Sequence, residues 1–153
     1  MVDASEKLLR ALNSDCADSL SQIIAEKQQE DFEALQKLLS PDPSVNREHC
    51  VKAIYALGRW GNTSVVGDIC HLLPTLDESG RISAVDSLGR LGTEEALAGI
   101  LDCVNDTSPQ VRKFVVRALG KIDNAASRAK LQEVATQESV NYIRDQAARY
   151  LKG

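Results

Sequence analysis

Three stretches of the chain read alike: AIYALGRWG (53–61), AVDSLGRLG (84–92) and VVRALGKID (115–123). Each contains a Leu-Gly pair followed by a basic and an apolar residue, and the glycine recurs every 31 residues, at Gly58, Gly89 and Gly120. A repeated unit of this length is typical of solenoids, in which each unit buries its apolar face only against its neighbours. The repeat therefore predicts a stack of similar units.

The residues before each glycine have the spacing of a helix with one apolar face. In the third stretch the apolar positions are Val111, Val115 and Leu119. A fourth copy, QAARYLKG, places Leu151 32 residues after Leu119, with Ile143 and Ala147 before it. Spacings of four residues keep side chains on one helical face. We expect the anchor glycine to end each helix, because glycine adopts the left-handed C-terminal conformation without strain.

A second helix is predicted after each short turn. The turns offer good N-cap residues: Asn62 and Thr63, then Thr93, then Asp123 and Asn124. The apolar positions that follow are again helical: Val66, Ile69 and Leu73; Leu97, Ile100 and Val104; Leu131, Val134 and Ala135. Pro74 is expected to end the first of these helices. Each unit is thus predicted to be a helical hairpin, and no strand pattern is present.

The stretch from Asp106 to Asp123 resembles the HEAT-like repeats of the phycobilisome-lyase type. Those repeats show an Asp, then Pro-x-Val-Arg, then Ala-x-x-Ala-Leu-Gly; the matching residues here are Asp106, Pro109, Val111, Arg112, Ala118, Leu119 and Gly120. Other copies match in part, at Asp77, Arg81, Leu88 and Gly89 and at Ile143, Arg144 and Leu151. The resemblance covers about residues 42–153 and implies an all-α fold, a right-handed α–α solenoid of HEAT-like hairpins.

We predict a single solenoid domain over residues 1–153. Its parts are a degenerate N-terminal repeat or cap (1–41), HEAT-like repeats (42–76, 77–105 and 106–137) and a C-terminal half-repeat (138–153). The cap is expected to form helices over about 4–13, 16–28 and 31–40. Residues 1–45 carry 4 basic and 9 acidic side chains, which suits the polar outer face of a terminal repeat.

The C-terminal end allows several interpretations. The last helix is either the natural cap, because Lys152-Gly153 is a good helix stop, or the point where a longer protein has been cut. A third alternative is a homodimer, in which an uncovered stripe of Ile143, Ala147 and Leu151 docks on a second copy of the chain.

Composition excludes several function classes. Of the 153 residues, 4% are aromatic and the net charge is −4, which disfavours nucleic-acid binding. No apolar run is long enough to insert into a membrane. The cysteines, Cys16, Cys50, Cys70 and Cys103, contain no CxxC pair, so we expect a cytoplasmic protein with reduced thiols. Catalytic motifs of the GxSxG, HExxH and Gly-rich phosphate-loop kinds are absent, so we expect no enzyme and no cofactor.

Acidic and basic residues recur together at the entrance to each repeat. Arg81, Arg112 and Arg144 lie near the core side of their helices, and Asp77, Asp106 and Glu138 precede them. Guanidinium and carboxylate groups pair well when half-buried. We interpret the set as a structural ladder that fixes the register of the repeats, with an anion site as the alternative. Cys50 replaces the arginine in the first copy.

Two histidines and two cysteines form the sharpest chemical alternative. His49, Cys50, Cys70 and His71 come from the two arms of one predicted hairpin, and two Cys with two His are a zinc ligand set. We favour the interpretation without metal: adjacent residues point about 100° apart on a helix. Cys103 is expected in the core, and Trp60 in the core near its turn.

The outward faces remain as candidate binding surfaces. On the second helices, which line the concave side of HEAT-like solenoids, the predicted partner-binding residues are Ser64, Gly67, Asp68, His71, Glu95, Ala98, Asp102, Ala129, Lys130 and Glu133. On the first helices, the outward residues include Lys52, Tyr55, Asp86, Phe114, Arg117 and Arg149. Arg59, Arg90 and Lys121 recur at the 31-residue period, and we interpret them mainly as solvated residues that favour the helix C-terminal dipole.

The predicted function is that of a non-catalytic scaffold that binds another protein on its curved helical surface. The alternative, implied by the resemblance, is a bilin lyase-like or phycobilisome-associated protein that handles pigment. A tetrapyrrole needs basic residues near its propionates, and the second-helix positions offer mainly Lys130.

Overall fold

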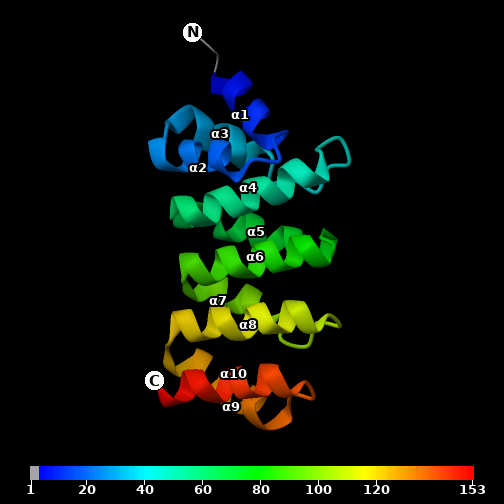
Figure 1. The fold of residues 1–153 in the computed structure, drawn as a ribbon, viewed down its shortest axis with the longest axis vertical. Helices are drawn as coiled ribbons and strands as arrows, with labels where there is room; N and C mark the ends of the chain where they lie inside the picture. Colours follow the sequence, from blue (N-terminus) through cyan, green and yellow to red (C-terminus); the bar gives the residue numbers. More distant parts are fainter. Residues whose placement is uncertain (1–3) are drawn as a thin grey trace.

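The computed structural model describes residues 4–153, in which every regular element is helical (Figure 1). The elements are α1 (Ala4–Leu12), α2 (Ala17–Glu26), α3 (Gln29–Lys37), α4 (Arg47–Trp60), η1 (Thr63–Val65), α5 (Val66–Leu72), η2 (Leu73–Thr75), α6 (Glu78–Leu91), α7 (Glu94–Leu101), α8 (Pro109–Ile122), α9 (Ala125–Gln137) and α10 (Asn141–Lys152). The three helices predicted before residue 41 are present; residues 1–3 of that predicted cap lie outside the described residues.

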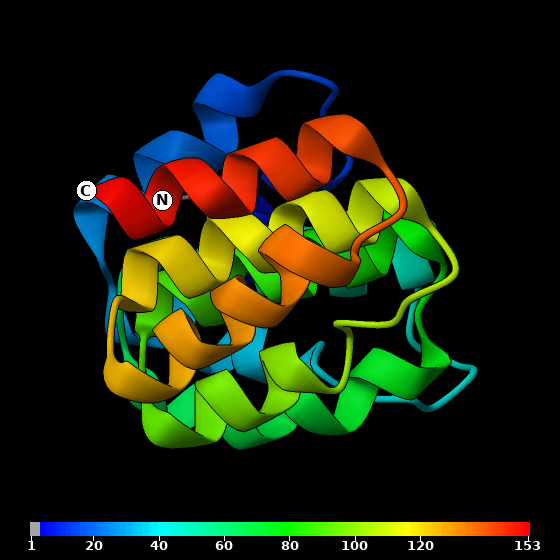
Figure 2. The same ribbon diagram turned by 90° about the horizontal axis from the view of Figure 1, so that it is seen from below.

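The helices form two layers along one axis. The first helices of the hairpins, α4, α6, α8 and α10, lie side by side and run in the same direction, with α5, α7 and α9 behind them (Figure 1). The view along the axis shows the two layers (Figure 2). The helices α1, α2 and α3 cover one end of the stack, and α10 lies at the other. The predicted all-α solenoid is confirmed.

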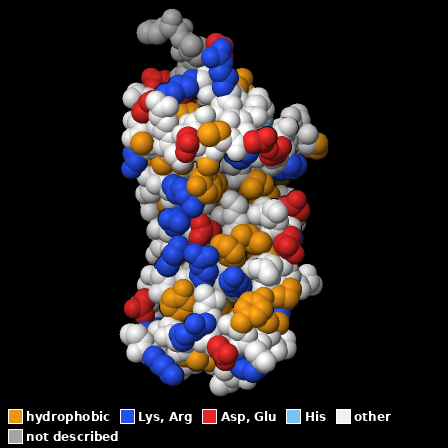
Figure 3. Space-filling view, in the orientation of Figure 1, with side chains coloured by type: hydrophobic (Ala, Val, Ile, Leu, Met, Phe, Trp, Pro, Cys, Tyr) orange, Lys and Arg blue, Asp and Glu red, His pale blue; other side chains and the backbone are white. Residues whose placement is uncertain are grey.

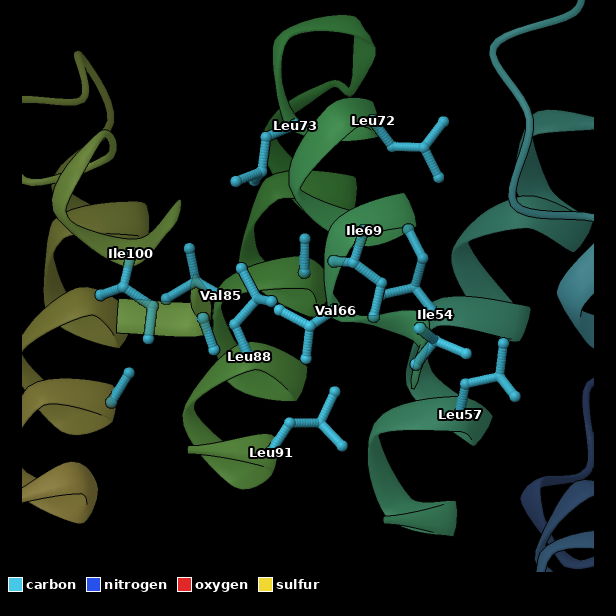
Figure 4. Packing of buried hydrophobic residues seen from close by; sticks show 14 of the residues in the cluster. Ile54, Leu57, Val66, Ile69, Leu72, Leu73, Val85, Leu88, Leu91 and Ile100 are labelled. Carbon is cyan, nitrogen blue, oxygen red and sulfur yellow. The ribbon is translucent and has the colours of Figure 1, made fainter. Parts of the chain in front are cut away.

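The core lies between the two layers. Leu57, Leu88 and Leu119, which belong to the repeated Leu-Gly pairs, are fully buried. Figure 4 shows Leu57 and Leu88 with residues of α5 such as Val66 and Ile69 between them. Burial of one such side chain contributes roughly 1.5–3 kcal/mol, so the repeated leucines account for the stacking.

The anchor glycines do not end their helices, which corrects our prediction. The first helices continue to Trp60, Leu91 and Ile122, and the left-handed residues that end them are Gly61 (φ 82°), Gly92 (φ 66°) and Asp123 (φ 48°). Gly58, Gly89 and Gly120 lie inside the helices, one turn earlier.

Close approach of neighbouring first helices explains these internal glycines. A Cβ on Gly58 would lie 2.8 Å from the Cα of Ser87, and one on Gly89 would lie 2.8 Å from the Cβ of Ala118. The buried Ser87 hydroxyl also donates a hydrogen bond of 2.9 Å to the carbonyl of Ile54. Each glycine therefore admits a residue of the next repeat, and the 31-residue period records this contact.

The predicted N-caps are confirmed for the second helices. The Asn62 side chain accepts a hydrogen bond from the Ser64 N–H, and Thr93 accepts one from Ala96. Asn124 forms a reciprocal capping box with Ser127. Caps of this kind contribute about 0.5–2 kcal/mol each.

The apolar stripe of α10 is covered within the chain. Ile143 and Ala147 are fully buried and Leu151 is half-buried, because α10 packs against α8 and α9. The expectation of an uncovered stripe was wrong, and the surface on which a homodimer through this half-repeat depended is not exposed.

Candidate functional site

The arginines at the repeat entrances connect successive repeats. Arg81 donates two hydrogen bonds to the carboxylate of Asp106, from Nε (2.8 Å) and Nη2 (3.2 Å). Arg112 donates two to Glu138 in the same way, both 3.1 Å long. A third nitrogen, Nη1, binds a carbonyl of the loop that enters the same repeat: Leu76 for Arg81 and Asp106 for Arg112. Each guanidinium thus joins two loops, which is a structural task.

The carboxylates of these pairs are stabilised in their ionised form. Burial opposes ionisation of Asp106, but hydrogen bonds from Arg81 and from the Ser108 N–H outweigh it and hold the pKa of Asp106 below its usual value. Burial likewise opposes ionisation of Glu138, and hydrogen bonds from Arg112 and the Val140 N–H lower its pKa. The charges are therefore satisfied by the protein, which leaves little capacity for an external anion.

The ladder has a different form at each end of the stack. Arg144 binds the Glu138 carbonyl (3.0 Å) and the Asn141 side chain (2.7 Å) of its own repeat. In the first repeat the buried Cys50 occupies the arginine position, and Asp77 instead caps α6 through the Gly80 N–H. A cavity of about 360 Å³ lies at this seam, lined by residues that include Arg47, Val51 and Leu76.

The two histidines and two cysteines do not assemble into a metal site. The His49 ring is hydrogen-bonded to the side chain of Asn13 (2.8 Å), and the exposed His71 ring to the Gly67 carbonyl (2.8 Å). Cys50 is fully buried, and the Cys70 thiol faces the Glu95 carbonyl. Within residues 4–153, no three His, Cys, Asp or Glu side chains are arranged to hold a metal ion.

The predicted partner-binding residues lie on the outward side of the second helices. Ala98 and Ala129 are exposed, and Gly67 is half-buried beneath the Glu95 side chain. The acidic members, Asp68, Glu95, Asp102 and Glu133, are all exposed. Lys130 pairs with Glu133 at 2.6 Å, so the one lysine of the set is already neutralised. We name these outward residues of α5, α7 and α9 the second-helix face.

A cleft opens at the C-terminal end of this face. Its volume is about 430 Å³, and it lies between the loop that joins α7 to α8 and the second half of α9. Lys130, Glu133 and Gln137 line it on one side, and Val104 and Asn105 on the other. Lys130 and Glu133 were expected in a binding surface, whereas the loop residues were not, because their approach to α9 depends on how the hairpins stack.

The sequence analysis missed a charge cluster on the first helices. Asp86 accepts an ion pair from each of three cations: Arg90 (3.1 Å), Lys121 (3.5 Å) and Arg59 (3.7 Å). These cations were expected to be solvated. The available signal was that Asp86 stands one helical turn before Arg90, midway in a column whose neighbours are Tyr55 and Arg117.

Comparison with known proteins agrees with this architecture. A family model for HEAT repeats matches residues 69–152. Among solved structures, the chain is similar to one from the complex of CpcE and CpcF of phycocyanin lyase from Nostoc sp. PCC7120, with 19% identity and a TM-score of 0.70. The match covers 99% of this chain and 64% of that chain, so this chain spans under two thirds of its length. No curated protein sequence matches.

A search for membrane spans gave none: across the described helices, none combines the length and apolar character that crossing a bilayer requires.

Proposed function

The chain belongs to the HEAT-repeat family, and from that premise we propose that it is a non-catalytic scaffold that binds another protein on its second-helix face. The observation that carries the proposal is the cleft of about 430 Å³ beside α9, which gives this exposed face a concave feature into which a partner's side chains fit. Folded helices hold both walls of the cleft, so little ordering free energy is lost on binding.

The charge of the face favours a partner segment with basic residues. Four exposed carboxylates, on Asp68, Glu95, Asp102 and Glu133, lie along it, and its lysine is paired internally. Opposite charges at an interface rim accelerate association and exclude partners of the wrong sign. Small exposed residues such as Ala98 and Ala129 let a partner approach the helix backbone closely.

Affinity capture from a lysate of the source organism tests the proposal. The bait is the wild-type chain, compared with the double variant Ala98→Glu/Ala129→Glu. The matched control is Ala17→Glu/Ala25→Glu, which makes the same change at exposed positions of α2. We expect a protein identified by mass spectrometry to be retained by the wild type and the control and lost by the double variant. Equal retention by all three chains would rule out the second-helix face.

A bilin lyase-like role is the second candidate, supported by the fold match to a phycocyanin lyase complex over nearly all of this chain. Since Lys130 is paired with Glu133, a pigment with two propionates would need cations from a partner subunit. Visible absorbance after mixing the chain with a free bilin tests this role. A shifted and intensified band, together with a phycobiliprotein in the captured fraction, would favour it over the scaffold; an unchanged spectrum would remove it.

A further inference from the structure

The two helix layers carry opposite charge. The first helices α4, α6, α8 and α10 carry twelve basic and four acidic side chains. The second helices α5, α7 and α9 carry two basic and four acidic ones. Figure 3 shows Lys and Arg side chains gathered over α4, α6 and α8, with hydrophobic side chains beside them. A chain with a net charge of −4 therefore presents one strongly basic face.

The centre of this face is the Asp86 cluster, formed by Asp86, Arg59, Arg90 and Lys121. One carboxylate is shared by three cations from three successive helices, so the cluster keeps a local excess of two positive charges. Burial opposes ionisation of Asp86, but the Arg90 hydrogen bond and the charges of Arg90, Lys121 and Arg59 outweigh it and lower its pKa. Asp86 thus stays charged and holds the cations together without neutralising them.

Aromatic rings position two of the arginines on this face. The Arg59 guanidinium lies 3.6 Å from the centre of the Tyr55 ring, and that of Arg117 lies 4.9 Å from the centre of the Phe114 ring. A stacked guanidinium keeps the N–H groups at its edge available for a carboxylate. Arg59 Nη1 has no hydrogen-bond partner within the described chain, although it lies within ion-pair distance of Asp86. A preference for helix C-termini does not account for Arg117, which lies in the middle of α8.

We propose that this basic face binds an acidic segment of a protein partner, separately from the second-helix face. Packed helices lie about 8–10 Å apart, so the cations present a ladder with that repeat. An α-helix that lies across α4, α6 and α8 with an acidic residue at every seventh position has carboxylates about 10.5 Å apart on one side, which matches it. Arginine mixed with aromatic residues is typical of protein interfaces. Duplex DNA would need about 6–10 phosphate contacts for comparable binding.

A labelled peptide tests the proposal by fluorescence anisotropy. The probe is an alanine-rich helical peptide with Glu at every seventh position, and its counterpart has Lys at the same positions. At about 0.05 M salt, where surface charges are weakly screened, we expect only the Glu peptide to bind. The variant Arg90→Glu/Lys121→Glu is expected to weaken binding at least about tenfold. The control Arg10→Glu/Lys37→Glu, which has the same change in net charge at exposed positions of α1 and α3, is expected to bind like the wild type.

Asp86→Asn distinguishes a binding role from a purely structural one. Removing the internal carboxylate destabilises the cluster but frees its cations, so we expect tighter binding of the Glu peptide, by about two- to fivefold. Thermal melts identify any variant that fails to fold. Weaker binding by folded Asp86→Asn, or unchanged binding by folded Arg90→Glu/Lys121→Glu, would overturn the proposal. So would a duplex DNA that binds in place of the peptide, or salt-dependent self-association by sedimentation that the same double variant abolishes.

Discussion

The guanidinium of Arg112 and the carboxylate of Glu138 face each other edge to edge, joined by two parallel hydrogen bonds of 3.1 Å across a repeat boundary. The Glu138 side chain is 8% exposed and that of Arg112 17%, so water screens the pair weakly. The same arrangement of Arg81 and Asp106 joins the preceding boundary. Correct stacking of α8 on the last hairpin therefore depends on a charged contact as well as on apolar burial.

Arg112→Ala is expected to lower the free energy of unfolding by about 2–3 kcal/mol, because it leaves the Glu138 carboxylate half-buried without its partner. Chemical denaturation measures this change. The comparison is Arg10→Ala, which breaks an exposed ion pair with Glu6 and is expected to cost at most about 0.5 kcal/mol. Similar losses for both variants would show that the repeat boundary gains nothing from its charged pair.

Acid is expected to weaken the ladder. The pKa values of Asp106 and Glu138 are lowered in the folded state, mainly by their arginine partners working against burial. Their stabilising contribution is therefore complete above the unfolded-state pKa values of about 4–4.5 and is lost as pH falls towards the lower folded-state values. Melting temperatures from neutral pH downwards measure this loss, which Glu138→Gln should reduce. A melting profile that Glu138→Gln leaves unchanged would contradict it.

Gly89→Ala is expected to destabilise the stack by about 1–3 kcal/mol, because the added methyl group collides with Ala118 of the next helix. Helix propensity alone predicts the opposite sign, a gain of about 1 kcal/mol. The control is Gly67→Ala, where the added group meets only the flexible end of the Glu95 side chain, at 3.2 Å. A stabilised Gly89→Ala protein would show that the neighbouring helices separate at no cost.

Asp31 is a buried acid whose replacement should stabilise the protein. Its side chain is only 2% exposed and its Oδ1 has no hydrogen-bond partner within residues 4–153; burial raises its pKa. The ionised form is thus penalised at neutral pH, and the penalty disappears below the unfolded-state pKa of about 4. Asp31→Asn is expected to raise the unfolding free energy at pH 7 by about 1 kcal/mol and to have no such effect near pH 3. A pH-independent effect would contradict the electrostatic explanation.

One cysteine should react far faster than the others. Cys16 is exposed, whereas burial raises the pKa values of Cys50 and Cys70, and raises that of Cys103 to about 11. Since the thiolate is the reactive form, a maleimide at neutral pH should label Cys16 alone in the native chain. Mass spectrometry of proteolytic fragments locates the label. Rapid labelling of Cys103 in folded protein would mean that the core opens at this point.

The repeat architecture was predictable because it is encoded in local patterns. Leu57, Leu88 and Leu119 mark the buried stripe, and Thr93 and Asn124 mark helix starts, so each signal lies within a few residues of its effect. The roles of the glycines were not predictable in the same way. Gly89 resembles a helix end in the sequence, and only the position of Ala118 in the next helix shows that it marks a close contact.

Charged groups show the same limit. The pairing of Arg81 with Asp106 and of Arg112 with Glu138 crosses a boundary, and its partner is set by the stacking of the repeats. Asp86 looked like an isolated acid, because two of its three cations belong to other helices. The cleft beside α9 has walls from two hairpins and no signature in either. Features that arise between repeats therefore need coordinates, whereas features within a repeat do not.

Cys50 in place of an arginine makes the stack chemically asymmetric. The two later boundaries are closed by ion pairs that acid disrupts, whereas the boundary between α4 and α6 keeps the neutral hydrogen bond from Ser87 to Ile54. Loss of structure in acid should consequently have a direction, starting at α10 and proceeding towards α4. The N-terminal helices would then persist as a folded remnant after the C-terminal hairpins have separated.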